Sequence, residues 1–319
     1  MNITILGSGR WASCLAWYAH TIGHSVCMWG RPGSKSLTAL KNTHQNEYLT
    51  LDSSIRFSES LHDALSFSDH IIISISSQYL RDLCRDIARH STQNKTFVLA
   101  MKGVEKGTGL RLSQIVDDEI TNTHTTVVWV GPGHVQSFVN MIPNCMLMCS
   151  QSEDMTKQCI DIFTSDLIRL YIGDDLIGIE IGAAAKNVVG IAAGMLDGFG
   201  YTSLKGALMA RGSREVSRLV MAMGGNERTV YGLSHIGDYE ATLFSPYSHN
   251  RAFGEAYVLK KPFLKLAEGV STAESLMFLA KKYGVDMPIT AAVFAIVNQS
   301  EEPQKVLKNL FLRETKHEF

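Results

Sequence analysis

The sequence lacks a strong charge of either sign and lacks an unbroken apolar run long enough to cross a membrane. Its 319 residues include 30 Lys and Arg against 31 Asp and Glu, so the formal net charge is -1. Without a global basic field, nucleic acid and anionic membranes are excluded as general partners, and an anionic ligand needs a local cationic pocket. The longest weakly polar stretch, residues 181–196, is interrupted by Lys186 and bracketed by Glu180 and Asp197. This stretch predicts a buried helix and no membrane insertion.

The sequence also lacks the cysteine spacing of a disulfide framework or a metal site. None of its 6 cysteines forms a CxxC pair, and no His or second Cys pair near Cys145 and Cys149 completes a metal ligand set. We interpret the cysteines as small core residues of a protein in a reducing cytoplasm. No cationic segment precedes an apolar stretch at the start of the sequence, so we expect no signal peptide.

The first half of the sequence alternates short β-rich runs with amphipathic helical segments. Hydrophobic residues make up 45% and charged residues 19%, which is typical of a globular protein. Continuous apolar strands separated by helices predict a parallel sheet that is covered on both faces. The candidate strands are Ile3–Leu6, Ser25–Trp29, His70–Ser76, Thr96–Met101, Thr126–Val130 and Arg169–Ile172.

The character of the sequence changes after about Asp175. Strand signals stop there, and helical patterns rich in Ala, Gly, Leu and Met follow. We therefore place a domain boundary near Gly178. The predicted fold class is α/β, with a Rossmann-like doubly wound sheet in residues 1–178 followed by an all-α C-terminal domain in residues 179–319.

A glycine-rich turn joins the first predicted strand to the first predicted helix. Gly7 permits the tight turn, Gly9 lets the backbone approach a pyrophosphate, and Ala12 lets the helix pack on the strand. Backbone amides at the start of a helix favour a phosphate anion. In this context the turn predicts a dinucleotide site, and the alternative is an ordinary glycine-rich turn.

The end of the second predicted strand bears on the choice of cofactor. It reads Trp29-Gly30-Arg31, without the acidic residue that would accept the ribose hydroxyls of NAD. An arginine at this place can accommodate the 2′-phosphate of NADP, so Arg31 favours NADPH or the use of both cofactors. The alternative is that Arg31 points into solvent, as most arginines do.

Two further motifs follow predicted strands. Lys102-Gly103 comes after one strand, and Gly131-Pro132-Gly133 comes after the next. Because ligands of open α/β sheets bind at the carboxyl ends of the strands, we expect Lys102 and the amides of the second motif in the site. The alternative for Lys102 is an ordinary surface lysine.

The helical half contains polar groups that a core helix and its neighbouring loops do not need. Lys186 lies in an otherwise apolar stretch of small residues, where a lysine is costly unless it is paired or used. Asp238 could pair with such a cation, and the run from Ser248 to Arg251 could bind phosphate. The alternatives are a lysine that reaches solvent from the helix edge and loop residues that are merely solvated.

Taken in order, these motifs resemble those of the bacterial, cytoplasmic type of NAD(P)-dependent glycerol-3-phosphate dehydrogenase. The resemblance covers most of the chain, and its helical-half motifs are more specific than the glycine-rich turn. The matching segments read GSGRW, HQNEYL, AMKG, GPG, EIGAAAKNVVGIAAGMLDGFG, LMARGSREVSRL, GLSHIGDYEAT, SHNRAFG and AEGVST. The resemblance implies reversible reduction of dihydroxyacetone phosphate to sn-glycerol 3-phosphate by NADPH or NADH, a supply for phospholipid synthesis, and a homodimer.

The resemblance also implies a role for each matching residue. Lys186 is the general acid and base at the reacting oxygen, and Lys102 and Asp238 complete the catalytic group. The implied cofactor contacts are Gly7, Gly9, Arg10, Trp11, Arg31, Lys102, Val135, His249 and Glu268. The implied substrate contacts are Lys102, Gly131, Gly133, Lys186, Asp238, Ser248, His249, Asn250 and Arg251. No metal ligand is implied.

The chain departs from the family's pattern around the expected ligand. In this chain His249 stands at the position of the first arginine in the family's Ser-Arg-Asn-Arg loop. The replacement removes a fixed positive charge and the paired N–H donors of a guanidinium group. The family's G-P-S/T motif has Gly133 in place of the hydroxyl residue, and Ala12 replaces a usual glycine. Two other interpretations therefore stay open: a related dehydrogenase of another keto or hydroxy compound, and a dinucleotide-binding sensor that has lost catalysis. The retained catalytic residues argue against the sensor.

Overall fold

The computed structural model describes residues 1–90, 92–315 and 317–318, and these residues divide into two compact units. The first unit comprises Met1–Lys102 and Leu110–Glu180, and the second comprises Gly103–Gly109 and the chain from Ile181 on. The separation after Glu180 falls two residues beyond the predicted end of the first domain. The sequence did not indicate that the short segment Gly103–Gly109 would join the second unit.

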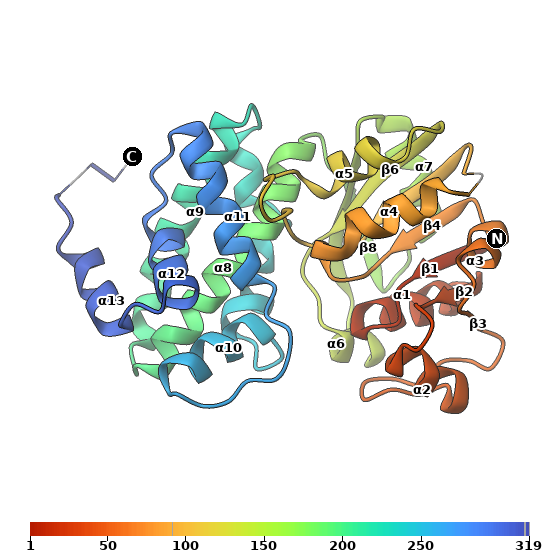
Figure 1. Ribbon diagram of the computed structural model, residues 1–319, viewed down its shortest axis with the longest axis horizontal. Coiled ribbons are helices and arrows are strands. Elements are labelled where there is room, and N and C mark those ends of the chain that lie inside the picture. The colour runs from red at the N-terminus through yellow and green to blue at the C-terminus, as the bar shows by residue number, and fades with distance from the viewer. Residues whose placement is uncertain (91, 316, 319) are drawn as a thin grey trace. The chain divides into compact units, whose positions relative to one another are not determined.

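The first unit is built on one eight-stranded sheet with helices on both faces (Figure 1). The strand order is β3-β2-β1-β4-β5-β6-β7-β8, which begins with the order of the dinucleotide-binding fold. All neighbouring strands are parallel except β6 and β7. The predicted Rossmann-like α/β class is therefore confirmed. The elements are β1 (Asn2–Leu6), α1 (Arg10–Thr21), β2 (Ser25–Trp29), α2 (Lys35–Thr43), β3 (Arg56–Ser58), α3 (Leu61–Phe67), β4 (His70–Ile73), η1 (Ser77–Tyr79), α4 (Leu80–Ala88), β5 (Lys95–Leu99), α5 (Leu112–Glu119), β6 (His124–Val130), α6 (Val135–Val139), β7 (Asn144–Ser150), α7 (Glu153–Phe163) and β8 (Ile168–Ile172).

The sheet differs from the predicted strands at several places. β3 is a three-residue edge strand without its own hydrophobic period, and β7 lies in the cysteine-containing run that we interpreted only as core. Two predicted strands were too long, because β4 ends at Ile73 rather than Ser76 and β5 ends at Leu99 rather than Met101. The apolar pattern continues beyond the last strand pairing, so it does not mark where the ladder ends.

Apolar side chains of the sheet and of α1, α6 and α7 form one buried cluster. Tyr18 of α1 is buried in it, and its hydroxyl donates a hydrogen bond of 2.5 Å to the carbonyl oxygen of Phe163 in α7. The ring of Trp129 in β6 meets Tyr18 edge-on, with 6.2 Å between the centroids. The cysteines are free thiols and all except Cys145 are buried, as core residues are. This packing fixes the carboxyl ends of the strands, where the predicted motifs lie.

From Leu176 on, every element in the described part of the chain is a helix. The predicted helical character of this half is therefore confirmed. The elements are α8 (Leu176–Gly198), η2 (Thr202–Leu204), α9 (Lys205–Ala222), η3 (Glu227–Tyr231), η4 (Ile236–Asp238), η5 (Glu240–Phe244), α10 (His249–Val258), α11 (Gly269–Tyr283), α12 (Pro288–Gln299) and α13 (Pro303–Phe311). Short helical turns thus separate α9 from α10, and one of them, η5, is a π-helix.

The helix α8 is both long and apolar. Among the described residues it is the one helix long and apolar enough to cross a membrane by length and composition, and 83% of its most apolar window is buried inside the structure. The predicted buried helix over residues 181–196 is thus confirmed. Its burial means that any charged group on its inner faces must find a partner from a neighbouring element.

Glycines let α10 approach α8 at backbone distance. A Cβ atom at Gly194 of α8 would overlap the carbonyl oxygen of Arg251, and a Cβ atom at Gly254 of α10 would overlap the carbonyl oxygen of Ile191. The two helices therefore touch through their main chains, which leaves no room for a side chain at either position. This contact holds the start of α10 beside α8.

The segment that carries Asp238 is fastened to α8 by a buried histidine. The His235 Nδ1–H group donates to the carbonyl oxygen of Gly182 at 2.7 Å, and its Nε2 atom accepts a hydrogen bond of 2.7 Å from the Tyr239 hydroxyl. Gly182 allows this approach, because a Cβ atom there would lie 3.2 Å from that of His235. Burial is the main cause and the nearby Lys186 ammonium a further one that together lower the pKa of His235 to about 4. His235 is therefore neutral when the protein is folded at neutral pH.

We expect Gly194→Ala to destabilise the protein by at least about 2 kcal/mol, because its methyl group would force α10 away from α8. The measurement is the free energy of unfolding in urea. Gly206→Ala is the matched control: an added Cβ there meets nothing within 4 Å in α9, and a helical alanine should stabilise by up to about 1 kcal/mol. Equal effects of the two substitutions would contradict the backbone contact.

We expect the folded state to lose stability as the pH falls from about 6.5 toward 4, because unfolded histidine binds a proton that buried His235 does not. The loss from this residue at pH 4.5 should be roughly 2–3 kcal/mol. The measurement compares urea unfolding at pH 7 and pH 4.5 for the wild type and for His235→Asn, which removes the titration. Tyr239→Phe removes the hydrogen bond but keeps the imidazole, so it should retain the acid loss. An unchanged pH dependence in His235→Asn would contradict the assignment.

Candidate functional site

The glycine-rich turn between β1 and α1 has the geometry that a dinucleotide pyrophosphate requires. Gly7 has a φ of +136° and a Cβ atom there would overlap the carbonyl group of Ser74, so only glycine fits. Gly9 is the N-cap of α1 and provides no capping side chain, and an added Cβ atom would meet nothing within 4 Å. The positive end of the twelve-residue helix α1 is therefore open to an anion.

The residues after β2 form a polar cluster beside this turn. The Ser8 hydroxyl lies 2.7 Å from the Ser36 hydroxyl and 3.3 Å from that of Ser34. The Arg31 guanidinium stacks on the ring of Tyr79 at 5.3 Å from its centroid. Hydroxyl groups and an arginine, with no carboxylate between residues 28 and 36, are groups that suit a phosphate ester. Ser34 and Ser36 were not predicted as part of the site, because serines in a turn carry no specific signal.

The structure brings the two strand-end motifs together. The Lys102 ammonium after β5 donates a hydrogen bond of 2.8 Å to the carbonyl oxygen of Gly131 after β6. Neighbouring parallel strands end at the same edge of the sheet, which explains why motifs distant in sequence meet. The predicted position of Lys102 at this edge is thus observed, and Lys102 has a partner there rather than an ordinary surface environment.

The glycine that replaces the family's hydroxyl residue has a structural reason. Gly133 has a φ of +148°, and a Cβ atom there would overlap the ring of Phe138 in α6. That ring packs against Trp11 of the first helix, with 6.0 Å between the centroids. Val135, a predicted cofactor contact, is buried at the start of α6, and Arg10 stacks on a tyrosine ring at 5.5 Å from its centroid. The predicted cofactor residues of the first unit therefore line one end of the sheet.

The second unit contains a buried ion pair between Lys186 and Asp238. The Lys186 ammonium lies 2.9 Å from a carboxylate oxygen of Asp238 and donates a hydrogen bond of 2.6 Å to the Thr242 hydroxyl. The side chains of Lys186 and Asp238 are only 9% and 2% exposed. Thr242 lies in the π-helix η5, a rare conformation that often occurs at functional sites. The predicted pairing of Lys186 with Asp238 is therefore observed, and Thr242 is a partner that the sequence did not reveal.

The predicted phosphate loop is held by its own hydrogen bonds. The Ser248 hydroxyl caps α10 by accepting from the Arg251 backbone amide, and His249 is the first residue of that helix. The Asn250 side-chain oxygen accepts a hydrogen bond of 2.9 Å from the amide of Gly269, next to Glu268 at the start of α11. The structure therefore brings Asn250 and Glu268 near each other, although they are far apart in the sequence.

The Arg251 guanidinium is already bonded to carboxylates. It contacts Asp197 at 2.7 Å and Glu255 at 3.1 Å, and its side chain is 16% exposed. A second cation, Lys205, contacts the same Asp197 oxygen at 2.7 Å and is 5% exposed. Burial opposes the ionisation of Asp197, but the hydrogen bonds from Lys205 and Arg251 lower its pKa overall. The sequence did not single out Lys205, and only its position in an amphipathic helix could have suggested burial.

Comparison with known proteins gives a consistent result along the chain. The family model described as the N-terminus of NAD-dependent glycerol-3-phosphate dehydrogenase matches residues 2–156, and the model of the C-terminus matches residues 175–308. Glycerol-3-phosphate dehydrogenase (NAD(P)+) of Staphylococcus epidermidis is 34% identical over 99% of both chains. A relative named glycerol-3-phosphate dehydrogenase (NAD(P)+) 1, from Salinibacter ruber, is 33% identical over 99% of this chain and 97% of its own.

A solved structure agrees with these relatives. The crystal structure of glycerol-3-phosphate dehydrogenase from Coxiella burnetii is 26% identical, covers 98% of this chain and 99% of its own, and has a TM-score of 0.90. The likeness extends over both units. The chain therefore belongs to the NAD-dependent glycerol-3-phosphate dehydrogenase family and is an NAD(P)-dependent oxidoreductase.

Proposed function

We propose that the chain reduces dihydroxyacetone phosphate to sn-glycerol 3-phosphate with NADPH or NADH, reversibly, and that Lys186 exchanges the proton. The observation that carries this proposal is the buried Lys186 ammonium, which Asp238 and Thr242 hold on the inner side of α8. A fixed, desolvated ammonium beside a carboxylate suits proton donation to an oxygen that gains negative charge. The family to which the chain belongs supports the same reaction.

Each residue of the ion pair has a distinct part in the proposed step. NADPH or NADH, when bound, would supply the hydride that the carbonyl carbon of the substrate accepts. Lys186 donates a proton to the carbonyl oxygen as the alkoxide develops, and it takes a proton from the hydroxyl group in the reverse direction. Asp238 keeps the ammonium oriented, and burial strengthens its electrostatic interaction with Lys186. Lys102, whose ammonium donates to the carbonyl oxygen of Gly131, completes the proposed catalytic group.

We assign the cofactor to the groups that fit an anion in the first unit. The open helix start after Gly9 suits the pyrophosphate, and the cluster of Arg31, Ser34 and Ser36 suits a 2′-phosphate. This arrangement favours NADPH. The proposed contacts are Gly7, Gly9, Arg10, Trp11, Arg31, Lys102, Val135, His249 and Glu268.

The proposed substrate phosphate lies at the start of α10. His249 and Asn250 begin that helix, so their backbone amides are at the positive end of its dipole. These amides offset part of the charge that the family's arginine would supply at position 249. A phosphate contact by Arg251 has to compete with two carboxylates. The proposed substrate contacts are Lys102, Gly131, Gly133, Lys186, Asp238, Ser248, His249, Asn250 and Arg251.

We further propose a cellular setting for this reaction. The product, sn-glycerol 3-phosphate, supplies phospholipid synthesis, and the enzyme works in the cytoplasm as a homodimer. The family resemblance supports this setting, and the buried free thiols are compatible with a reducing compartment. Sedimentation at several protein concentrations tests the dimer.

We expect Lys186→Ala to lower kcat for dihydroxyacetone phosphate reduction about 10²- to 10⁴-fold, because the developing alkoxide loses its proton donor. The measurement is the oxidation of NADPH or NADH at saturating substrate. Lys281→Ala, at an exposed lysine of α11, is the matched control and should leave kcat unchanged. An unchanged kcat in Lys186→Ala would refute the assigned role, and absence of wild-type turnover with both cofactors would refute the reaction.

We expect Arg31→Ala to raise KM for NADPH about tenfold or more while changing KM for NADH far less, because only NADPH carries the 2′-phosphate. The measurement is a titration of each cofactor at saturating dihydroxyacetone phosphate. Arg56→Ala, at an arginine of β3 that stacks on Phe67, serves as the control and should change neither constant. A clear wild-type preference for NADH would overturn the NADPH assignment.

A further inference from the structure

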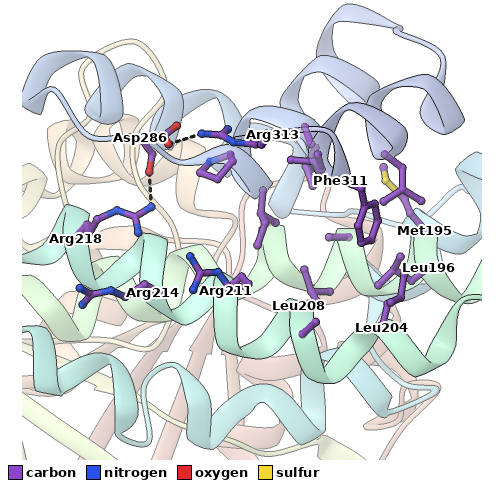
Figure 2. A pocket seen from close by; sticks show the side chains of 18 of the residues that line it. Met195, Leu196, Leu204, Leu208, Arg211, Arg214, Arg218, Asp286, Phe311 and Arg313 are labelled. Atoms are coloured by element: carbon purple, nitrogen blue, oxygen red, sulfur yellow. Dashed lines mark hydrogen bonds and ion pairs between the residues drawn. The ribbon is translucent and has the colours of Figure 1, made fainter. Parts of the chain in front are cut away.

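The second unit contains an open groove of about 1150 Å³ that the proposed reaction does not use. Its wall is apolar over most of its length, with side chains from α8, α9, α12 and α13. Figure 2 shows Met195 and Leu196 of α8, Leu208 of α9 and Phe311 of α13 gathered at one end. Phe311 is 67% exposed although it lies in this apolar wall. A groove of this kind favours a hydrocarbon ligand.

The other end of the groove is cationic. Arg211, Arg214 and Arg218 follow one another at spacings of three and four residues, so they share one face of α9 (Figure 2). Arg218 donates to the carbonyl oxygen of Asp286 at 2.6 Å, and Arg313 contacts the carboxylate of the same residue at 2.5 Å. The guanidinium groups of the groove are therefore gathered at one end.

Arg211 carries the positive charge that is least balanced at this end. Its guanidinium donates to the backbone carbonyl of Glu318 at 3.2 Å, and it forms an ion pair with no carboxylate of residues 1–90, 92–315 and 317–318. Its side chain is exposed, so it is accessible from solvent. Two of the other guanidinium groups have carboxylate partners, because Arg214 pairs with Glu227 at 3.6 Å and Arg313 pairs with Asp286.

We infer that this groove binds an anionic amphiphile with a single hydrocarbon chain, whose head group meets Arg211 and whose tail lies against Leu208 and Phe311. Leu208 lies three residues, about 4.5 Å along the helix, before Arg211 on α9, so a tail can leave a head group at Arg211 and extend over Leu208 toward Leu204 and Phe311. A neutral hydrocarbon would leave the arginine charge unmatched, and a small anion would leave the apolar wall exposed. The inference is independent of the proposed reaction.

The experiment titrates the full chain with decyl phosphate below its micelle concentration and follows the heat of binding. We expect saturable binding of one molecule per chain. Decanol, which has the tail without the charge, should bind at least about tenfold more weakly, because it lacks the hydrogen bonds to a guanidinium. Inorganic phosphate, which has the charge without the tail, should give no measurable binding at the same concentration.

Variants at each end of the groove separate the two contributions. Arg211→Ala should weaken decyl phosphate about tenfold or more and leave decanol unchanged. Ala207→Trp places a large side chain at an exposed groove position of α9 and should weaken both ligands. Arg228→Ala, at an exposed arginine outside the groove, is the control and should change neither. Urea unfolding checks that each variant is folded. If Ala207→Trp does not fold, the effect of Arg211→Ala on decyl phosphate binding tests the proposed site by itself.

Three results would overturn the inference. The first is equal affinity for decyl phosphate and decanol, or a decyl phosphate affinity that Arg211→Ala does not change. The second is binding that does not saturate and that lowers the unfolding temperature, as a detergent does. The third is no binding by the wild type together with conversion of a dimer to a monomer by Ala207→Trp, which would make the groove an interface between two copies of the chain.

Discussion

The buried ion pair of Lys186 and Asp238 is the constraint on which the helical unit depends. An ammonium on a buried apolar helix is strongly destabilising unless a carboxylate and further hydrogen bonds match it. Asp238 can do so only if the segment that carries it is pressed against α8. Gly182 leaves room for His235, which makes that contact, and Gly190 leaves room for the π-helix beside it. The small residues of α8 are therefore needed to bring Asp238 close to the Lys186 ammonium as well as to let the helices pack.

The same helix limits what the proposed phosphate loop can do. Backbone contact at Gly194 fixes the start of α10, and Asp197 of α8 engages the guanidinium of Arg251. An arginine that the sequence offers as a phosphate ligand is thus occupied in joining two helices. The chain has a histidine where the family pattern has its other arginine, so the helix start at Ser248 and His249 becomes the more important anion-binding feature under the proposed function.

The sequence predicted those features whose physical cause is local. A glycine turn between a strand and a helix, a lysine in an apolar helix, and motifs at strand ends each have a cause within a few residues. What it could not predict depends on distant partners, because the carbonyl group that His235 binds lies 53 residues away. Lys205 looks like a solvated helix residue until Asp197 is placed beside it. Gly133 likewise looks like a lost hydroxyl until the Phe138 ring is seen to fill its place.

A reversible reaction requires that the site of Lys186 and Asp238 tolerate both protonation states of Lys186. The hydroxyl group of Thr242, the third member of this network, explains how it can. When Lys186 is charged, it donates to the Thr242 hydroxyl at 2.6 Å and pairs with Asp238 at 2.9 Å. The Thr242 hydroxyl in turn lies 3.4 Å from the other oxygen of Asp238, to which it can donate. If Lys186 gives up its proton as proposed, the neutral amine still has hydrogens to donate and the carboxylate keeps its hydroxyl donor. Asp238 then loses its counter-charge but keeps hydrogen-bond donors, so proton transfer can proceed in either direction without breaking the hydrogen-bond network.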